Sequence, residues 1–133
     1  ALRGGDLIVK GNAGARTGID MKGGTIIIGG NAGAFTGFMM QRGRIIVCGD
    51  VSANMGDSMY DGMIFVGGEV KSLGSDCVEG EMNEYEVRWL EQKLNNAEIN
   101  SKTPASKFKK YVAGKKLWNY DNLEPSERKG ILG

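Results

Sequence analysis

The sequence predicts an all-β solenoid: a right-handed, single-stranded parallel β-helix of 19-residue coils with a C-terminal α-helical extension. The main observation is a repeat: one sequence pattern occurs four times in residues 4–79, at a fixed spacing of 19 residues. The first two copies, residues 4–22 and 23–41, agree at 11 of their 19 positions. A second observation is that glycines recur at the same places in each copy, with a short β-branched run between them. A repeat this short corresponds to one coil.

Recurring glycines mark the predicted corners of each coil. Glycine adopts φ > 0 without the steric penalty that a Cβ atom brings, so glycines between short apolar runs indicate turns. Three corners per copy leave three short straight edges. The predicted corner positions are Gly11, Gly14, Gly18, Gly30, Gly33, Gly37, Gly49, Gly56 and Gly68.

The first edge of each copy is a β-branched run of strand length, beginning with Leu7-Ile8-Val9. If one copy is one coil, equivalent residues of successive coils are strand neighbours about 4.8 Å apart, and each edge becomes a parallel sheet. Two inward ladders are then expected. They are Leu7, Ile26, Ile45 and Ile64, and Val9, Ile28, Val47 and Val66.

The residues between these ladders form a predicted outward row. Strand side chains alternate between faces, so Ile8, Ile27, Ile46 and Phe65 point away from the interior. Leaving such side chains in water forgoes about 1.5–3 kcal/mol each, so the row should be covered. Two covers are open: the C-terminal tail with the Trp118 region, or a partner protein. Ile8, Ile27, Ile46, Phe65 and Trp118 are therefore the candidate partner-docking residues.

The chain is predicted to have two parts. Residues 1–82 form the β-helix, and residues 83–133 form a helical extension that caps it, docks a partner, or does both. Asn83 and Glu86 form a capping pair for a helix from about Glu84 to Ala97, which we expect to lie across the open end of the last coil. Thr103-Pro104 and Gly114 predict a second helix. The lysines from 107 to 116 are interpreted as its solvated face rather than as a nucleic-acid site.

Composition excludes several kinds of chemistry. The net charge is +1 and the apolar runs are short, so nothing indicates nucleic acid or a membrane. The chain has no histidine, which removes the usual general base and the commonest zinc ligand. We therefore assign no catalytic, cofactor-binding or metal-binding residue. Cys48 and Cys77 occupy different places in their copies, which predicts free thiols and favours a cytoplasmic location.

One polar position recurs beside the corner glycines, at Asn12, Asn31, Asp50 and Glu69. An asparagine there can hydrogen-bond along the stack, whereas adjacent carboxylates could hold a cation. Solvated loop acids are the commoner case. No two glycines stand at positions i and i+2, so the glycines do not form a dinucleotide-binding motif.

Two stretches of the repeat carry a family resemblance. They are Gly11-Asn12-Ala13-Gly14 with Gly18, and Gly30-Asn31-Ala32-Gly33 with Gly37. The repeats, about residues 4 to 82, resemble the GXGXG domain, the glycine-rich β-helix at the C-terminal end of the glutamate synthase large (alpha) subunit. The same repeat occurs in the related glycine-rich subunit of formylmethanofuran dehydrogenase.

The resemblance implies a supporting role. In glutamate synthase the β-helix holds the amidotransferase and barrel domains in relation to one another. The chain is then a non-catalytic subunit or domain of a glutamate synthase-like complex in nitrogen metabolism. No cofactor is expected in this chain; flavin and iron–sulfur belong to partner subunits, a glutamine amidotransferase and a flavin/iron–sulfur barrel.

Two alternatives stay open at this point. One is that the chain is the glycine-rich subunit of a formylmethanofuran dehydrogenase-like complex. The other is a homo-oligomer that forms through exposed coil ends. An acyltransferase on a left-handed β-helix is disfavoured, because those proteins use hexapeptide repeats and a catalytic histidine, whereas this chain has a 19-residue period and no histidine.

Overall fold

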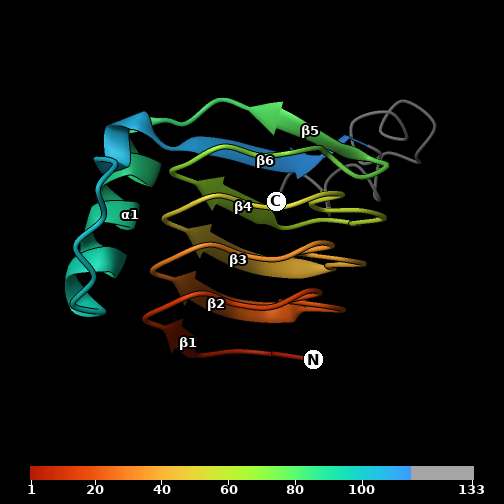
Figure 1. The fold of residues 1–133 in the computed structure, drawn as a ribbon, viewed down its shortest axis with the longest axis horizontal. Coiled ribbons are helices and arrows are strands. Elements are labelled where there is room, and N and C mark those ends of the chain that lie inside the picture. Colours follow the sequence, from red (N-terminus) through yellow and green to blue (C-terminus); the bar gives the residue numbers. More distant parts are fainter. Residues whose placement is uncertain (115–133) are drawn as a thin grey trace, which may run out of the picture.

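The computed structural model describes residues 1–114, which form stacked coils 19 residues apart with one helix alongside (Figure 1). Its single sheet has six strands in the order β1-β2-β3-β4-β6-β5. Strands β1 to β4 are parallel neighbours, one from each coil. Their bounds are Asp6–Val9 for β1, Lys22–Ile28 for β2, Arg42–Val47 for β3 and Met63–Val66 for β4. The predicted solenoid of stacked parallel coils is confirmed.

The register of the parallel strands is the one that the repeat predicts. Leu7 pairs with Ile26, Ile26 with Ile45, and Ile45 with Ile64. The second ladder, from Val9 to Val66, pairs in the same way. From the second coil onward, the side chains of both ladders join the methionines of the third edge in one internal core, which contains Met21, Met40 and Met59, each 0% exposed. Leu7, in the first coil, is 49% exposed and lies outside this core. A 19-residue repeat therefore corresponds to one full turn of backbone.

Only the first edge of the coil forms a regular sheet, which corrects the expectation of a sheet on every edge. The second edge makes isolated parallel bridges, such as Ala13 with Ala32. The third edge is a series of turns, because φ is positive at Arg16 (58°), Gly18 (77°) and Asp20 (52°) within five residues. A chain that reverses this often cannot stay extended.

The first tail helix is confirmed, but it lies in a different place from the one expected. Helix α1 spans Glu84–Asn96 and begins with a capping box between Asn83 and Glu86. Its 13 residues extend for about 20 Å, which is enough to pass four coils, and it runs beside the stack rather than across its end (Figure 1). The outward apolar row holds it there. It is not long and apolar enough to cross a membrane, and no other helix among residues 1–114 is either.

The second predicted helix is wrong. Residues Ala105–Lys107 form one 3-10 turn, η1, and Lys109–Ala113 form strand β6. Strand β6 pairs antiparallel with β4 on one side and with β5, Cys77–Gly80, on the other. If residues 109–113 were helical, the backbone N–H and C=O groups on the free edge of β4 would have no partners. As a strand, these residues pair with that edge. Strands β6 and β5 therefore cover the end of the solenoid that the first tail helix was expected to cover.

Candidate functional site

The outward row is covered by the chain itself over three of its four positions. Ile27, Ile46 and Phe65 are 1%, 0% and 0% exposed, and they pack in one cluster with Leu90 and Leu94 of α1. Of the two covers considered for this row, the tail is the one observed. The assignment of these three residues to partner docking is therefore wrong, because burial against α1 leaves them no accessible surface.

The remaining two docking candidates have different outcomes. Ile8, in the first coil, is 43% exposed and can still contact a partner. Trp118 lies outside the described residues. One aromatic neighbour of the row among the described residues is Trp89, whose ring lies 5.4 Å from that of Phe65, with the Arg44 guanidinium 5.0 Å from the Trp89 ring.

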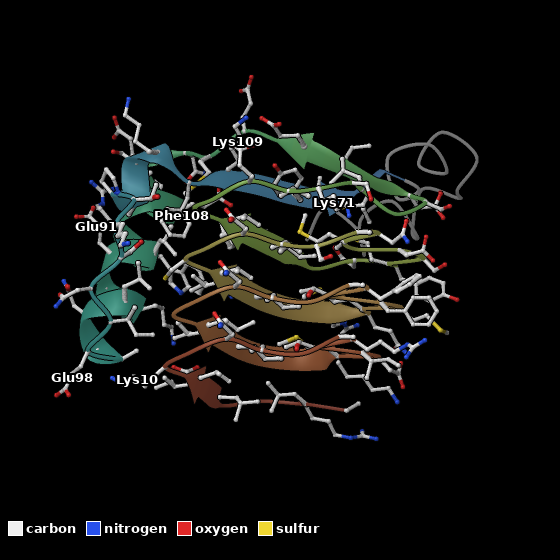
Figure 2. All side chains as sticks on the ribbon, viewed as in Figure 1. Lys10, Lys71, Glu91, Glu98, Phe108 and Lys109 are labelled. Atoms are coloured by element: carbon white, nitrogen blue, oxygen red, sulfur yellow. The ribbon has the colours of Figure 1, made fainter. Side chains whose placement is uncertain are left out.

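Polar contacts fix α1 against the stack at both ends. At its start, Lys110 Nζ of β6 lies 2.8 Å from Glu86 Oε2. At its end, Lys10 Nζ of the first coil donates to the carbonyl of Ala97 and, at 3.2 Å, to that of Glu98. A cation at a helix C-terminus is favoured by the helix dipole. Figure 2 shows Lys10 beside Glu98 at the lower end of the helix.

The predicted corner glycines divide into two structural groups. Gly18, Gly37 and Gly56 have φ of 77°, 76° and 70°, which is the positive φ expected at a corner. Gly30 and Gly49, in contrast, do not have positive φ and are required by close approach. A Cβ on Gly49 would overlap Asn31 Oδ1 and lie 2.8 Å from the Gly30 carbonyl oxygen.

Two of the other four corner glycines belong to the close-approach group, and the two in the first coil belong to neither group. Gly68 resembles Gly49, since its Cβ would lie 2.6 Å from the Gly49 carbonyl oxygen, and a Cβ on Gly33 would lie 2.7 Å from Ala15 N. At Gly11 and Gly14 of the first coil, a Cβ would have nothing within 4 Å. Close packing between coils, rather than φ alone, therefore explains this second set of glycines.

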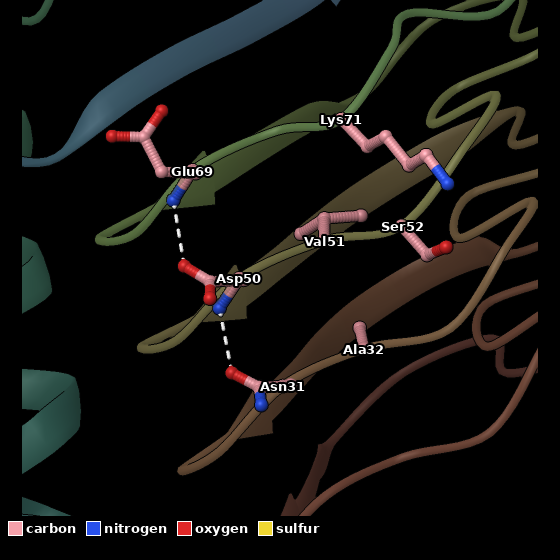
Figure 3. Close-up of a pocket in the computed structure, with 7 residues that line it drawn as sticks. All are labelled: Asn31, Ala32, Asp50, Val51, Ser52, Glu69 and Lys71. Atoms are coloured by element: carbon pink, nitrogen blue, oxygen red, sulfur yellow. Dashed lines mark hydrogen bonds between the residues drawn. The ribbon is translucent and has the colours of Figure 1, made fainter.

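The recurring polar position forms a ladder along the stack. Asn31 N donates to Asn12 Oδ1 at 2.7 Å, Asp50 N to Asn31 Oδ1 at 2.8 Å, and Glu69 N to Asp50 Oδ1 at 2.8 Å. Figure 3 shows the last two of these bonds at the edge of a shallow groove of about 350 Å³. The expected bonding along the stack is confirmed. Each side chain serves as the backbone acceptor of the next coil.

The groove beside this ladder offers little for catalysis. Asp50 uses one carboxylate oxygen for the backbone of the next coil. Within residues 1–114, no group of three or more histidine, cysteine, aspartate or glutamate side chains could hold a metal ion. We therefore interpret the ladder as part of the fold.

The two cysteines are free thiols, buried in different clusters. Cys77 lies in the internal core and Cys48 in the cluster beneath α1. Burial raises the pKa of Cys77 to about 11. Burial also raises the pKa of Cys48, with a smaller opposing effect from a hydrogen bond with Ser101. Both thiols therefore stay protonated at neutral pH, which makes them poor nucleophiles.

One surface was not assigned residues from the sequence: the side of the first coil that faces away from the second. We call it the open coil face and define it by Leu7, Ile8, Gly11, Asn12 and Gly14, all of which are exposed. The signal was available, because Gly11 and Gly14 repeat a spacing that in later coils accommodates a neighbouring backbone.

Comparison with known proteins gives one match. The model of the GXGXG motif family matches residues 1–125, which include all four copies of the repeat and all of the described tail. No curated protein sequence and no solved structure matches the chain. The matched range contains the glycine-rich coils described above, and the chain belongs to the GXGXG motif family.

Proposed function

We propose that the chain is a non-catalytic structural subunit or domain of a glutamate synthase-like complex. The observation that carries this proposal is the family match over residues 1–125, since the GXGXG family is associated with glutamate synthase-like proteins. In such a role the chain holds the catalytic units of the complex in relation to one another.

The geometry of the coils is consistent with a structural rather than a catalytic role. The residue types that suggest chemistry are used to join coils: the side chains of Asn12, Asn31 and Asp50 accept backbone N–H groups. Asp57 Oδ1 likewise accepts from Ser75 N at 2.7 Å. A stack bonded in this way is rigid and presents surfaces at fixed spacing, which suits a spacer between catalytic units.

The proposal places the chemistry in other chains. A glutamine amidotransferase would release ammonia, and a flavin/iron–sulfur barrel subunit would use it for reductive synthesis, both in the cytoplasm. The chain itself would hold neither the flavin nor the iron–sulfur cluster. Its contribution would be measured as assembly and as coupling between the two activities.

Co-expression of the tagged chain with candidate amidotransferase and barrel subunits tests this function. We expect a purified complex with flavin and iron–sulfur absorbance and glutamine-dependent glutamate formation. Gly49→Ala, which disrupts coil stacking, should reduce complex yield, whereas Gly80→Ala should not, because a Cβ there meets only ordinary contacts at 3.6–3.8 Å.

Two results would contradict the proposal. One is glutamine hydrolysis or acceptor reduction by the purified chain alone. The other is a complex that assembles and turns over equally well when the chain is omitted. Co-purification instead with subunits of a molybdopterin enzyme would support the formylmethanofuran dehydrogenase alternative.

A further inference from the structure

The sheet continues further along the stack than the second edge of the coils does. Strands β6 and β5 extend the sheet beyond β4, whereas the last parallel bridge of the second edge, among residues 1–114, joins Val51 to Val70. After β5 the chain leaves the stack to form α1 (Figure 1). The inner face of β6 therefore extends past the last residues of the second edge.

A pocket of about 270 Å³ lies where the second edge ends. Its coil side is formed by residues 66–70, and its other side by Lys107, Lys109 and Tyr111 of the tail. Tyr111 pairs with Ile64 of an inward ladder, so Tyr111 and Lys109 share the inner face of β6. Pockets for drug-sized ligands have about 300–1,000 Å³, so this pocket fits a smaller molecule.

Two backbone groups in this pocket lack the partners that their equivalents have. In the preceding coil, the Gly49 carbonyl accepts from Gly68 N at 3.0 Å. There also, Val51 N donates to the Glu69 carbonyl at 2.9 Å. The equivalent groups of the last coil are the Gly68 carbonyl and Val70 N, and neither has a hydrogen-bond partner among residues 1–114. Because the bonds between coils run along the stack, both groups point toward the pocket.

The Tyr111 hydroxyl opens into the pocket without a hydrogen-bond partner. Tyr111 is 6% exposed, and its hydroxyl makes no hydrogen bond with residues 1–114. Within the same residues, no fully buried side-chain oxygen lacks a partner, so this hydroxyl reaches the pocket surface. Burial raises the pKa of Tyr111, and nearby Glu79 adds to that effect, so the hydroxyl stays protonated at neutral pH. It can therefore donate a hydrogen bond to a ligand.

The pocket holds charges of both signs that the protein does not neutralise. Lys107 and Lys109 on the tail side and Glu69 on the coil side are all exposed. None of the three forms an ion pair with the part of the chain that the structure describes. Asp50 Oδ1 accepts from Glu69 N, but Glu69 ends the polar ladder, and its carboxylate meets no such donor among residues 1–114. A ligand with one anionic and one cationic group would match this arrangement.

We propose that this pocket binds a small zwitterion of the α-amino acid class. The ligand's carboxylate lies toward the tail side, where it accepts from the Tyr111 hydroxyl and faces Lys107 and Lys109. Its ammonium group lies toward the coil side, where it donates to the Glu69 carboxylate and the Gly68 carbonyl. A simple anion would be repelled by Glu69, and a simple cation by the two lysines. The inference goes beyond the proposed function and rests on the pocket alone.

The experiment follows the backbone amide NMR shifts of the isotopically labelled full chain. L-alanine and L-glutamine are the probes, since both carry the α-amino and α-carboxylate groups and they differ in size. We expect saturable shifts at Gly68 and Val70, with half-saturation at about 1 mM or below. Acetate, ethylamine and inorganic phosphate each lack one of the two charges, so they should require concentrations at least about tenfold higher.

Single substitutions in the pocket should weaken binding without unfolding the chain. Tyr111→Phe removes only the hydroxyl and Glu69→Gln only the charge, so each should raise the Kd for both amino acids about tenfold. Lys71→Met is the matched control and should leave the Kd unchanged, because Lys71 lies on the same coil as Glu69 but outside the pocket (Figure 3). Thermal unfolding checks the fold. Tyr111→Phe should keep its Tm, since the lost hydroxyl has no hydrogen bond within residues 1–114.

Three results would overturn the proposal. One is the absence of saturable shifts at Gly68 and Val70 with either amino acid. Another is equally tight binding of acetate, ethylamine or phosphate, which would show a site for a single charge. The third is an unchanged Kd in both Tyr111→Phe and Glu69→Gln. None of these measurements involves partner subunits, so this proposal and the proposed function fail separately.

Discussion

Lys110 Nζ lies 2.8 Å from Glu86 Oε2, and the two side chains are each only 15% exposed. The other oxygen of the same carboxylate, Glu86 Oε1, accepts from Asn83 N at 3.0 Å and completes the capping box of α1. One carboxylate therefore connects the start of the helix to β6, the strand that pairs with the edge of β4. The two covers of the stack, one along its side and one at its end, are joined at this residue.

Substitution of Glu86 should separate its two roles. Glu86→Gln keeps an oxygen for Asn83 N and loses the charge that faces Lys110, so we expect a loss of about 1 kcal/mol in the free energy of unfolding. Glu86→Ala removes both contacts and should lose about 2 kcal/mol. Urea unfolding measures both values. Lys110→Met is the matched control for the charge. If the loss in the double variant equals the sum of the losses in Glu86→Gln and Lys110→Met, the two side chains do not interact.

The corner glycines provide a test within one register position. A Cβ on Gly49 would overlap Asn31 Oδ1, so Gly49→Ala should lower the free energy of unfolding by about 2–3 kcal/mol through steric strain and loss of a ladder hydrogen bond. Gly11→Ala, at the equivalent place in the first coil, meets nothing within 4 Å and should be neutral. Chemical denaturation compares the two. Equal losses would show that intrinsic glycine conformation, rather than coil packing, determines this position.

The outward row can be tested by truncating one side chain at a time. Phe65 is 0% exposed beneath α1, and Phe65→Ala should cost about 3–5 kcal/mol. Ile8→Ala, in the same row but 43% exposed, should cost less than about 1 kcal/mol in the isolated chain. Hydrogen exchange should show faster exchange of α1 amides in Phe65→Ala. Unchanged helix protection in that variant would contradict the packing of α1 on this row.

Alkaline pH should destabilise the internal core. Burial raises the pKa of Cys77 from about 9 in the unfolded chain to about 11, so folding favours the protonated thiol. Its contribution is complete below pH 9 and is lost as pH rises through 11. The pKa of Tyr111, in the same core, is also raised, first by burial and then by nearby Glu79.

Thermal unfolding between pH 8 and pH 11.5 measures this effect. Tm should fall over the upper part of the range, and Cys77→Ala should reduce the fall without removing it, because Tyr111 still titrates. A Tm that stays flat to pH 11.5 in the unchanged chain would show that neither group is held in its protonated form by the fold.

Which residues stack on which was predictable from the sequence, because the repeat is a local property. A spacing of 19 residues places Ile26 against Ile45 and Asn31 against Asp50 whatever the tail does. The capping box of α1 was also predictable, since Asn83 and Glu86 satisfy each other within one helical turn. The family resemblance rests on the same local pattern.

The tertiary structure decided how the solenoid is covered. Residues 109–113 have a mixed pattern that fits a helix face or a strand, and the unpaired edge of β4 selects the strand. Helix α1 packs on the longest apolar surface. The row of Ile27, Ile46 and Phe65 extends along the side of the stack and offers such a surface, whereas the end of the stack does not. The sequence predicted the apolar row and the capped helix, but not which surface each tail segment covers, because that choice depends on surfaces that exist only once the coils have assembled.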